Sequence, residues 1–402
     1  HVAVIGAGIA GTSAAQALAR RGIRVTLIER DGPAAGGSGN EQGALYVKLA
    51  ADTNHQSRVY LAGLLYSHRW LTQLDSQHRL WSPVGVLQLA PHQREARRQA
   101  RFLDHHCLPA EVVRGVDADE ASRLAELPLP YGGLAYAQAG WARPRALCEH
   151  LATQPGITLR RGDVQTLEPH DAGGWCLGLD DASEVVADQV IIATAAAAAS
   201  LLQAQGLPLQ PVRGQVSRLR LAATAPRPAQ VVCAGGYVAP PLDDWLTFGA
   251  TFVPNDDAGE IRQADHRANI EELERTLPGY AASLAGHGQP LSAEALDGRA
   301  AIRAASPDKT PYAGPLPDQA AWHEDYAVLA KDATRVPAIA GRHHPGLWIS
   351  AAHGSRGLAS APLCAELLAS RICDEPLPLE APLADHLHPG RRVIRGIVRG
   401  ER

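Results

Sequence analysis

Three glycines near the amino terminus restrict the fold of this chain more than any other feature. A short apolar run, Val2–Ile5, opens the sequence and predicts a buried strand. The glycines follow at the spacing G-x-G-x-x-G, as Gly6, Gly8 and Gly11, and an alanine-rich stretch with helical periodicity comes next. A second apolar run ends on Glu29, roughly twenty residues beyond the glycines, where a dinucleotide-binding unit places an acid on the ribose. This order predicts a dinucleotide site.

Each glycine in this pattern has a physical reason. Gly6 permits a tight turn, Gly8 lets the backbone approach a pyrophosphate, and Gly11 allows the helix to pack closely on the strand. The free N–H groups and the positive dipole end of the helix then face the phosphates. These residues alone leave both FAD and NAD open.

Composition sets further bounds. A chain of 402 residues is too long for one small core, so we expect two domains. The apolar fraction of 46%, the charged fraction of 20% and the net charge of −4 are typical of a globular protein without an overall basic field. Six scattered cysteines, with no C-x-x-C pair, indicate a cytoplasmic location and no metal site. The longest apolar stretch, 190–202, is too short to cross a membrane.

The chain leaves the nucleotide-binding domain and returns to it. A glycine-rich loop at 32–48 predicts a backbone that passes close to a ligand, although a flexible loop would have the same composition. We expect a strand pair within 156–168, and the apolar run 190–192 predicts a buried parallel strand. From residue 208 onward, alternation predicts a second, mainly antiparallel sheet. Residues 346–369 repeat the opening order of strand, glycine turn and helix.

The predicted fold class is α/β, with a discontinuous Rossmann-like domain and a second, substrate domain built on a mainly antiparallel sheet. The predicted boundaries assign 1–80, 142–207 and 335–402 to the first domain, and 81–141 and 208–334 to the second. Residues 385–402 are expected to form a basic C-terminal tail. Because the chain begins with His1 directly at the first strand, without an initiator methionine, we expect it to be part of a longer polypeptide.

Several collinear blocks resemble the D-amino-acid-oxidase-like family of FAD-dependent oxidoreductases. The glycines with Glu29 and Arg30 look like the ADP-binding start of that family. Residues 187–195 resemble its second strand signature, which usually ends Ala-Thr-Gly, whereas this chain has Ala195 in place of the glycine. The turn at 353–362 supplies a second anchor for the isoalloxazine end of the ligand and makes the expected cofactor FAD.

The resemblance implies a set of FAD contacts. They are Gly6, Gly8, Ile9, Ala10, Gly11, Glu29, Arg30, Gly39, Asn40, Gln42, Gly43, Ala44, Val164, Ala193, Thr194, Ala195, Gly354, Ser355, Arg356, Gly357 and Leu358. The backbone N–H groups at 354–357 are expected near the flavin pyrimidine oxygen, where reduced flavin carries negative charge.

Within the family, the chain looks like the FAD-dependent halves of bifunctional enzymes that make 5-methylaminomethyl-2-thiouridine in tRNA. The stretch Gly-Asn-Glu-Gln-Gly-Ala-Leu-Tyr at 39–46 is the most specific, and 211–215 and 387–395 add to it. The resemblance implies that the carboxymethyl group of 5-carboxymethylaminomethyl(-2-thio)uridine is removed oxidatively at the tRNA wobble position. The products would be 5-aminomethyl(-2-thio)uridine and glyoxylate. A methyltransferase domain would form the other half of such a native chain.

Three side chains are candidates for the chemistry. Arg303, in a run that resembles the family's arginine-containing strand, is expected to bind the substrate carboxylate, because a guanidinium matches a carboxylate in two hydrogen bonds. A structural ion pair is its alternative role. Tyr237 is expected to donate a second hydrogen bond, although a core tyrosine would have the same sequence context. Lys48 is expected to stabilise charge near the flavin, or to be a solvated lysine.

Basic residues at the carboxyl end are candidates for tRNA contact. They are Arg391, Arg392, Arg395, Arg399 and Arg402. An arginine density of this kind favours phosphate binding, and a solubilising terminus is the alternative. Arginines at 94–101 are better explained as a solvated helix face.

Two other functions share most of these motifs. A FAD-dependent oxidase or dehydrogenase of a free small amine, such as glycine, sarcosine or a D-amino acid, would use the same Arg303 and the same glycine turns. A flavin-containing tRNA-binding module without catalysis is the second alternative, and the presence of Arg303 argues against it.

Overall fold

The computed structural model describes residues 1–401, which divide into two compact units. The first unit is His1–Gly39, Arg145–Pro211 and the chain from Arg303 onward; the second is Asn40–Pro144 and Val212–Ile302. Two segments lie in the opposite unit from the predicted one: 40–80 belongs to the second unit and 303–334 to the first.

Strand pairing gives the reason for both corrections. Strand β3 (Gly43–Leu45) pairs with β8 (Gly140–Ala142) in the second unit. Strand β20 (Tyr312–Pro317) pairs antiparallel with β21 (His343–Ala351) in the first. Such pairings join residues far apart in sequence, and composition shifts along the chain do not reveal them.

A largely parallel sheet forms the centre of the first unit. Its order is β20-β21-β13-β1-β2-β9, with β1 at Val2–Ile5, β2 at Val25–Glu29, β9 at Ile157–Arg161 and β13 at Gln189–Ile192. All neighbours are parallel except the edge strand β20. The carboxyl ends of the parallel strands therefore meet at one edge, where ligands bind in open α/β sheets.

A small antiparallel sheet also belongs to this unit. It contains β10 (Val164–Pro169), β11 (Trp175–Leu179) and β12 (Glu184–Ala187). The expected strand pair within 156–168 is wrong, because β9 extends the parallel sheet beside β2 whereas β10 pairs with β11.

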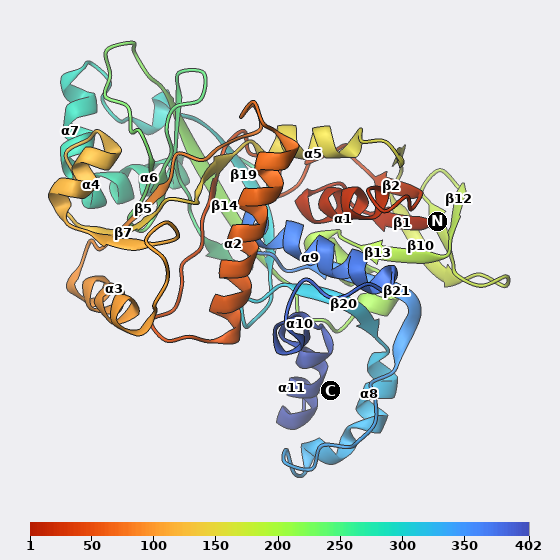
Figure 1. Cartoon of the computed structure of the whole chain (residues 1–402). Helices are drawn as coiled ribbons and strands as arrows, with labels where there is room; N and C mark the ends of the chain where they lie inside the picture. Colours follow the sequence, from red (N-terminus) through yellow and green to blue (C-terminus); the bar gives the residue numbers. More distant parts are fainter. Residues whose placement is uncertain (402) are drawn as a thin grey trace. The chain divides into compact units, whose positions relative to one another are not determined.

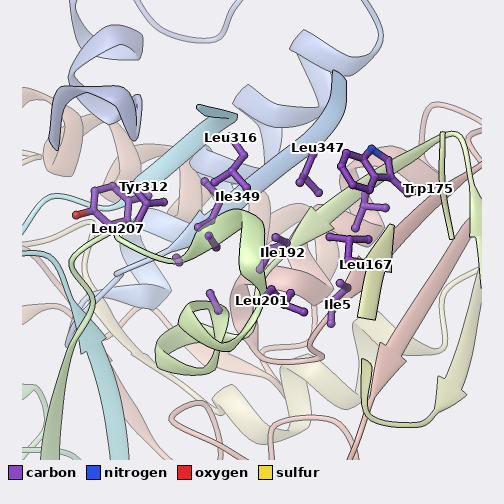
Figure 2. Close-up of a cluster of buried hydrophobic side chains, with 14 of the residues drawn as sticks. Ile5, Leu167, Trp175, Ile192, Leu201, Leu207, Tyr312, Leu316, Leu347 and Ile349 are labelled. Carbon is purple, nitrogen blue, oxygen red and sulfur yellow. The ribbon is translucent and has the colours of Figure 1, made fainter. Parts of the chain in front are cut away.

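The two sheets of the first unit share one apolar core (Figure 2). Ile5, Ile192 and Ile349 come from three neighbouring parallel strands, and Trp175 comes from the small sheet. The indole N–H of Trp175 donates to the carbonyl of Pro345 at 2.8 Å, so the ring is buried with its polar atom satisfied. Each fully buried large apolar side chain contributes about 1.5–3 kcal/mol, and this packing stabilises the first unit.

The second unit is built on a mainly antiparallel sheet of order β18-β14-β17-β16-β15-β5-β7-β6, with β19 also paired to β14. Its strands are β5 (Val86–Leu89), β6 (Arg114–Val116), β7 (Gly133–Tyr136), β14 (Gln210–Arg220), β15 (Val231–Cys233), β16 (Tyr237–Val238), β17 (Trp245–Gly249), β18 (Val253–Pro254) and β19 (Asp297–Ala305). Strands β5 and β15 are the parallel exception. The fold class predicted from the sequence is confirmed.

Helices complete both units (Figure 1). In the first unit they are α1 (Ile9–Ala19), α5 (Pro144–Ala152), α8 (Gln319–Asp325), α9 (Gly357–Ile372), α10 (Ala381–Leu387) and α11 (Gly390–Arg399); in the second they are α2 (His55–Leu74), α3 (Gln93–His105), α4 (Ala118–Ala125), α6 (Gln263–Thr276) and α7 (Pro278–Gly286). None of the helices within residues 1–401 has the length and apolar composition needed to cross a membrane.

A buried arginine organises the polar interior of the second unit. Arg213 on β14 is fully buried and forms an ion pair with Asp265 on α6. Its guanidinium also donates to the backbone carbonyls of Ala258 and Glu260. A buried charge is tolerated only when it is fully paired, so these bonds fix the loop that precedes α6.

The carboxyl terminus is helical and packed rather than an extended tail. The imidazole of His388 stacks on Trp322 of α8 with ring centroids 5.8 Å apart, and Val393 and Ile397 of α11 join the apolar core. Helix α11 lies beside α8 in Figure 1. Arg402 lies outside the described residues.

One ion pair fastens α11 to the rest of the unit. The guanidinium of Arg391 lies 3.1 Å from the carboxylate of Asp308 and donates to the carbonyl of Thr310 at 2.7 Å. Burial raises the pKa of Asp308, but the hydrogen bonds and charge of Arg391, with bonds from Ser306 and Thr310, outweigh it and lower the pKa to about 2. Because the folded pKa is below the usual value, the stabilisation is complete above about pH 4 and is lost as the pH falls toward 2.

We expect Arg391→Ala to lower the free energy of unfolding by about 2 kcal/mol at pH 7, because Asp308 loses its cation. The difference from wild type should be about half as large at pH 3. Thermal unfolding at both pH values measures it. Arg399→Ala is the control, because that side chain is exposed and its contact with Glu401 is 3.8 Å long. Equal effects of the two substitutions on the free energy of unfolding would contradict a stabilising ion pair between Arg391 and Asp308.

Candidate active site

The glycine turn after β1 is formed by close contacts that exclude side chains. Gly6 has a φ of +100°, and a Cβ atom there would lie 2.7 Å from the carbonyl oxygen of Ala193. A Cβ on Gly11 would lie 1.8 Å from the carbonyl oxygen of Gly6. At Gly8 the nearest atom would be the Ser38 hydroxyl at 3.3 Å, so this position is less constrained within the protein. The turn and the first helical turn of α1 are therefore fixed against β13.

Glu29 is held at the end of β2 by two backbone donors. The N–H of Ala7 donates to its carboxylate at 2.7 Å, and the N–H of Asp31 donates at 3.1 Å. Arg30 is largely exposed and pairs with Asp31 at 3.0 Å. The acid is thus preorganised beside the glycine turn, where the sequence placed it.

Two residues at this turn were missed by the sequence analysis. Ser38 accepts a hydrogen bond from the N–H of Ile9 at 2.9 Å, which satisfies one free donor of α1. Arg145 donates to the carbonyl of Gly39 at 3.0 Å and so fixes the end of the glycine-rich loop. A serine inside that loop was a visible signal for the first contact, whereas the second arises from tertiary folding.

A second helix amino terminus lies beside the first. A Cβ on Gly357, the first residue of α9, would lie 3.1 Å from the Cγ2 of Ile9, the first residue of α1. Figure 1 shows α1 and α9 side by side. Before α9, the N–H of Gly354 donates to the carbonyl of Ala304 at 2.8 Å, and Ala305 forms a β-bridge with His353. The strand that carries Arg303 therefore ends against this turn. Two sets of free N–H groups face the same edge of the sheet.

His353 is a packed and neutral residue of this turn. Its Nδ1 lies 2.9 Å from the hydroxyl of Ser360, and its Nε2 lies 3.2 Å from that of Ser350. Burial lowers the pKa of His353 to about 4, so the imidazole carries no charge at neutral pH. Its contacts orient the turn rather than supply a proton.

The end of β13 is strained and contains an unsatisfied hydroxyl. Ala195 adopts a φ of +52°, a left-handed conformation that accounts for the glycine usual in the family at this place. The buried hydroxyl oxygen of Thr194 has no hydrogen-bond partner among residues 1–401. Ala193 is buried against Gly6. A polar ligand at this edge would satisfy the threonine.

In the second unit, the segment before β3 is held by side chains. The amide Nε2 of Gln42 donates to the carbonyl of Pro240 at 2.8 Å, and the Tyr237 hydroxyl donates to the backbone carbonyl of Gln42 at 3.5 Å. Arg299 donates to the side-chain oxygen of Asn40 at 3.3 Å. The structure thus brings together Tyr237, Asn40 and Gln42, three residues that the sequence had assigned to substrate or cofactor.

The remaining candidates are placed as follows. Lys48 pairs with Glu95 at 3.1 Å, and its side chain is 44% exposed. Burial raises the pKa of Glu95, but Arg98 and Lys48 outweigh it and lower the pKa to about 2. Arg303 is half-buried in the first unit, whereas Lys48 and Tyr237 belong to the second. Val164 lies on β10 and packs against the core of Figure 2.

At the carboxyl terminus, the structure separates the predicted tRNA contacts. Arg391 is engaged with Asp308, and Arg392 is buried. These two residues thus contribute to the fold, and their contact with phosphate stays a prediction. Arg395 and Arg399 are exposed on α11.

The family model for FAD dependent oxidoreductases of the DAO type matches residues 1–371. The chain belongs to this family. FAD is therefore its cofactor, and the choice between FAD and NAD that the glycine motif left open is settled by the match. The geometry agrees with it, since a dinucleotide of this length needs anchors at both ends and the first unit has two adjacent helix amino termini.

Curated relatives and solved structures resemble the whole chain. The tRNA 5-methylaminomethyl-2-thiouridine biosynthesis bifunctional protein MnmC of Chromohalobacter salexigens is 61% identical over 401 residues, 100% of this chain. The chain spans 57% of the length of that relative. Iminodiacetate oxidase from Chelativorans is 26% identical with a TM-score of 0.72, covering 94% of this chain and 97% of that one. Glycine oxidase from Bacillus cereus, 18% identical with a TM-score of 0.74 over 96% and 97% of the two chains, shares the fold.

The residues present fit FAD. Gly6 and Gly11 leave no room for side chains at the turn, and the Thr194 hydroxyl is buried without a partner in the described chain. The N–H groups at the start of α1 would hold the pyrophosphate, Glu29 the ribose, and the turn at 354–357 the flavin end. FAD supplies an acceptor for a hydride.

We expect Gly11→Ala to weaken FAD binding roughly tenfold or more, since relieving the overlap with the Gly6 carbonyl moves α1 away from β1. Flavin absorbance of the purified protein and titration of the apoprotein with FAD measure this. Gly286→Ala, at the end of α7 in the second unit, is the control, because a Cβ there would meet no atom of residues 1–401 within 4 Å. A yellow Gly11→Ala protein with wild-type FAD affinity would refute the close packing of this turn.

Proposed function

We propose that this chain catalyses FAD-dependent oxidative removal of the carboxymethyl group from 5-carboxymethylaminomethyl(-2-thio)uridine at the tRNA wobble position. The observation that carries the proposal is the 61% identity, across the full chain, to a protein named for biosynthesis of 5-methylaminomethyl-2-thiouridine in tRNA. The products are 5-aminomethyl(-2-thio)uridine and glyoxylate.

The proposed reaction breaks one C–H and one C–N bond. A hydride leaves the methylene carbon between the amine and the carboxylate, while the nitrogen lone pair forms a C=N bond. Water adds to that carbon, the C–N bond breaks, and the nitrogen leaves as a primary amine. Two electrons and two protons leave the substrate in total, and bound FAD would supply the acceptor for the electron pair. The protein therefore needs to orient the substrate and to keep its amine neutral.

Arg303 and Tyr237 are the residues proposed to orient the substrate carboxylate. Arg303 lies two residues before the β-bridge between Ala305 and His353, so its strand is anchored to the turn proposed to hold the flavin end. The Tyr237 hydroxyl lies 3.5 Å from the Gln42 carbonyl, and its single proton would turn from that carbonyl to the substrate carboxylate. Lys48 is proposed to stabilise negative charge near the flavin, with its own charge shared with Glu95.

A second candidate is the oxidation of a free small secondary amine. Iminodiacetate, named for the solved relative at 26% identity, is itself a secondary amine carrying carboxymethyl groups. Both candidate reactions oxidise an amine that carries a carboxymethyl group. They differ in the rest of the substrate, which is a tRNA in the first candidate and a small molecule in the second.

The relatives are named bifunctional, and this chain spans 57% of the first of them. We propose that the chain supplies the oxidative activity in the cytoplasm. A methyltransferase part, acting on the amine that the oxidation releases, is proposed to correspond to the remaining length of the relatives.

We expect anaerobic addition of tRNA bearing the carboxymethylaminomethyl group to bleach the flavin absorbance of the purified protein, with release of one glyoxylate per flavin. Iminodiacetate, glycine and sarcosine should bleach it at least a hundredfold more slowly, because they lack the RNA contacts. Bleaching by a small amine at the rate of tRNA would favour the second candidate instead. If no compound bleaches the flavin, the result would favour a flavin-containing tRNA-binding module without catalysis.

Arg303→Ala serves as the site control in the same assay. The variant should stay yellow and lose at least a hundredfold in bleaching rate, since the carboxylate loses its charged partner. Arg94→Ala, a change at an exposed arginine of α3, should behave as wild type. A colourless Arg303→Ala protein would place this arginine in cofactor binding.

For tRNA binding, we expect the double substitution Arg395→Ala/Arg399→Ala to flatten the dependence of log affinity on log salt by roughly one to two units. Each exposed arginine that contacts a phosphate contributes roughly 0.7–0.9 to that slope. Arg94→Ala/Arg97→Ala removes two exposed arginines from α3 and is the charge-matched control. An unchanged slope in the α11 variant, or equal changes in both, would remove α11 from the tRNA surface.

A further inference from the structure

Phe252 is an aromatic side chain that the fold leaves outside its core. The ring is 58% exposed, whereas every other phenylalanine, tyrosine and tryptophan within residues 1–401 is buried or half-buried. A single exposed apolar residue needs no explanation by itself. Phe252 calls for one because its backbone is fixed, its strand leads from a residue of the proposed substrate site, and the residues that follow it are charged.

The backbone on both sides of Phe252 is held by the neighbouring strand β14. The N–H of Thr251 donates to the carbonyl of Gln215 at 3.1 Å, and the N–H of Gln215 donates to the Thr251 hydroxyl at 2.9 Å. On the other side, Val253 of the edge strand β18 pairs with the fully buried Arg213. Only the side-chain torsions of the ring remain to be ordered on binding, which lowers the entropic cost of a contact.

Phe252 also follows closely on a residue of the proposed substrate site. Tyr237, proposed to bind the substrate carboxylate, pairs with Gly249 on the neighbouring strand. Phe252 comes three residues after Gly249, so its Cα lies within about 16 Å of that of Tyr237, from about 5 Å between strands and at most about 3.6 Å per residue. The carboxymethylaminomethyl arm spans about 5 Å from the uracil ring to the carboxylate carbon. Tyr237 and Phe252 are thus close enough to contact one such arm and the base next to it.

We propose that the ring of Phe252 stacks on a base next to the wobble nucleotide of the bound tRNA. The inference rests on the proposed function. When the reactive arm draws the wobble base out of the anticodon stack, the neighbouring base loses a stacking partner. A phenyl ring replaces that partner whatever the base, because every base has a π-face. Single-stranded RNA loops are commonly bound by aromatic side chains in this way.

The charges beside the ring favour a base over a phosphate. Asp256, Asp257 and Glu260 follow Phe252 in the chain, and Arg262 pairs with Asp256 at 2.5 Å and with Glu260 at 2.7 Å. Three acids and one arginine leave this segment negative, so it repels a phosphate but not the uncharged face of a base. The same charges oppose a protein partner, because the core of a protein interface is depleted in charged residues. The contact is therefore stacking, without release of counterions.

The test measures how tightly the FAD-loaded protein binds an anticodon stem-loop RNA that bears the carboxymethylaminomethyl group. We expect Phe252→Ala to weaken the affinity roughly fivefold to a hundredfold, the range for loss of one base–aromatic stack. Phe252→Leu should lose nearly as much, whereas Phe252→Tyr should stay within about threefold of wild type, because only tyrosine keeps a ring. The dependence of log affinity on log salt should be the same in all of these proteins, since no phosphate contact changes.

Leu202→Ala is the control, because it also shortens an exposed apolar side chain but lies in the first unit. It should bind the RNA as wild type does. Wild-type affinity of Phe252→Ala or Phe252→Leu would overturn the proposal, and so would a loss in Phe252→Tyr as large as that in Phe252→Ala. If Phe252→Ala abolishes self-association of wild type in sedimentation and leaves RNA affinity unchanged, the ring belongs to a contact between copies of this chain instead.

A second measurement requires only the wild-type fold. Wild type is titrated with two further stem-loop RNAs, each lacking one of the two bases that flank the wobble nucleotide. One of them should bind about as weakly as intact RNA binds Phe252→Ala, and that variant should not distinguish it from intact RNA. Equal wild-type affinity for all three RNAs would overturn the proposal even if Phe252→Ala does not fold. Failure of wild type to bind intact RNA is a separate result that rejects the proposed function and, with it, this role.

Discussion

The close approach of α1 to β1 is the contact on which the rest of the first unit depends. The Gly6 carbonyl and Gly11 meet without room for a Cβ, and a Cβ on Gly6 would also lie too close to the carbonyl of Ala193. Three segments far apart in sequence are thereby brought to one edge of the parallel sheet. Because α9 packs against the first residue of α1, the second helix amino terminus is positioned by the same contact. Both ends of the FAD site therefore depend on the absence of side chains at the turn.

Buried polar groups in the second unit are paired to different extents. Arg213 has no exposure and its guanidinium is surrounded by Asp265, Gln215 and backbone carbonyls, so it stabilises the fold and is closed to solvent. Gln42 is equally buried but keeps an unpaired acceptor, with no partner for Oε1 among the residues described. Burial alone therefore does not distinguish a structural polar residue from a functional one.

The carboxyl terminus shows how tertiary packing divides equivalent charges. Arg391 and Arg395 lie one helical turn apart in a basic segment, and the sequence gives no reason to treat them differently. Helix α11 turns the first toward Asp308 and Tyr312, where its guanidinium lies 4.7 Å from the ring centroid, and leaves the second exposed. The stretch predicted to be a basic C-terminal tail contains a helix that contributes Val393 and Ile397 to the core. Its exposed arginines are consequently held on a rigid surface.

Local sequence determined the glycine turn, the strands and helices around it, the Glu29 position and the antiparallel character of the second sheet, since these follow from short-range periodicity and from backbone conformations that only certain residues adopt. It also carried the resemblance that led to FAD. Tertiary structure alone decided that 40–80 belongs to the second unit, that β9 and β10 enter different sheets, and that Lys48 pairs with Glu95. Strand partners and ion pairs join positions separated by many residues, and their energies depend on distance in space, which the order of residues along the chain does not specify.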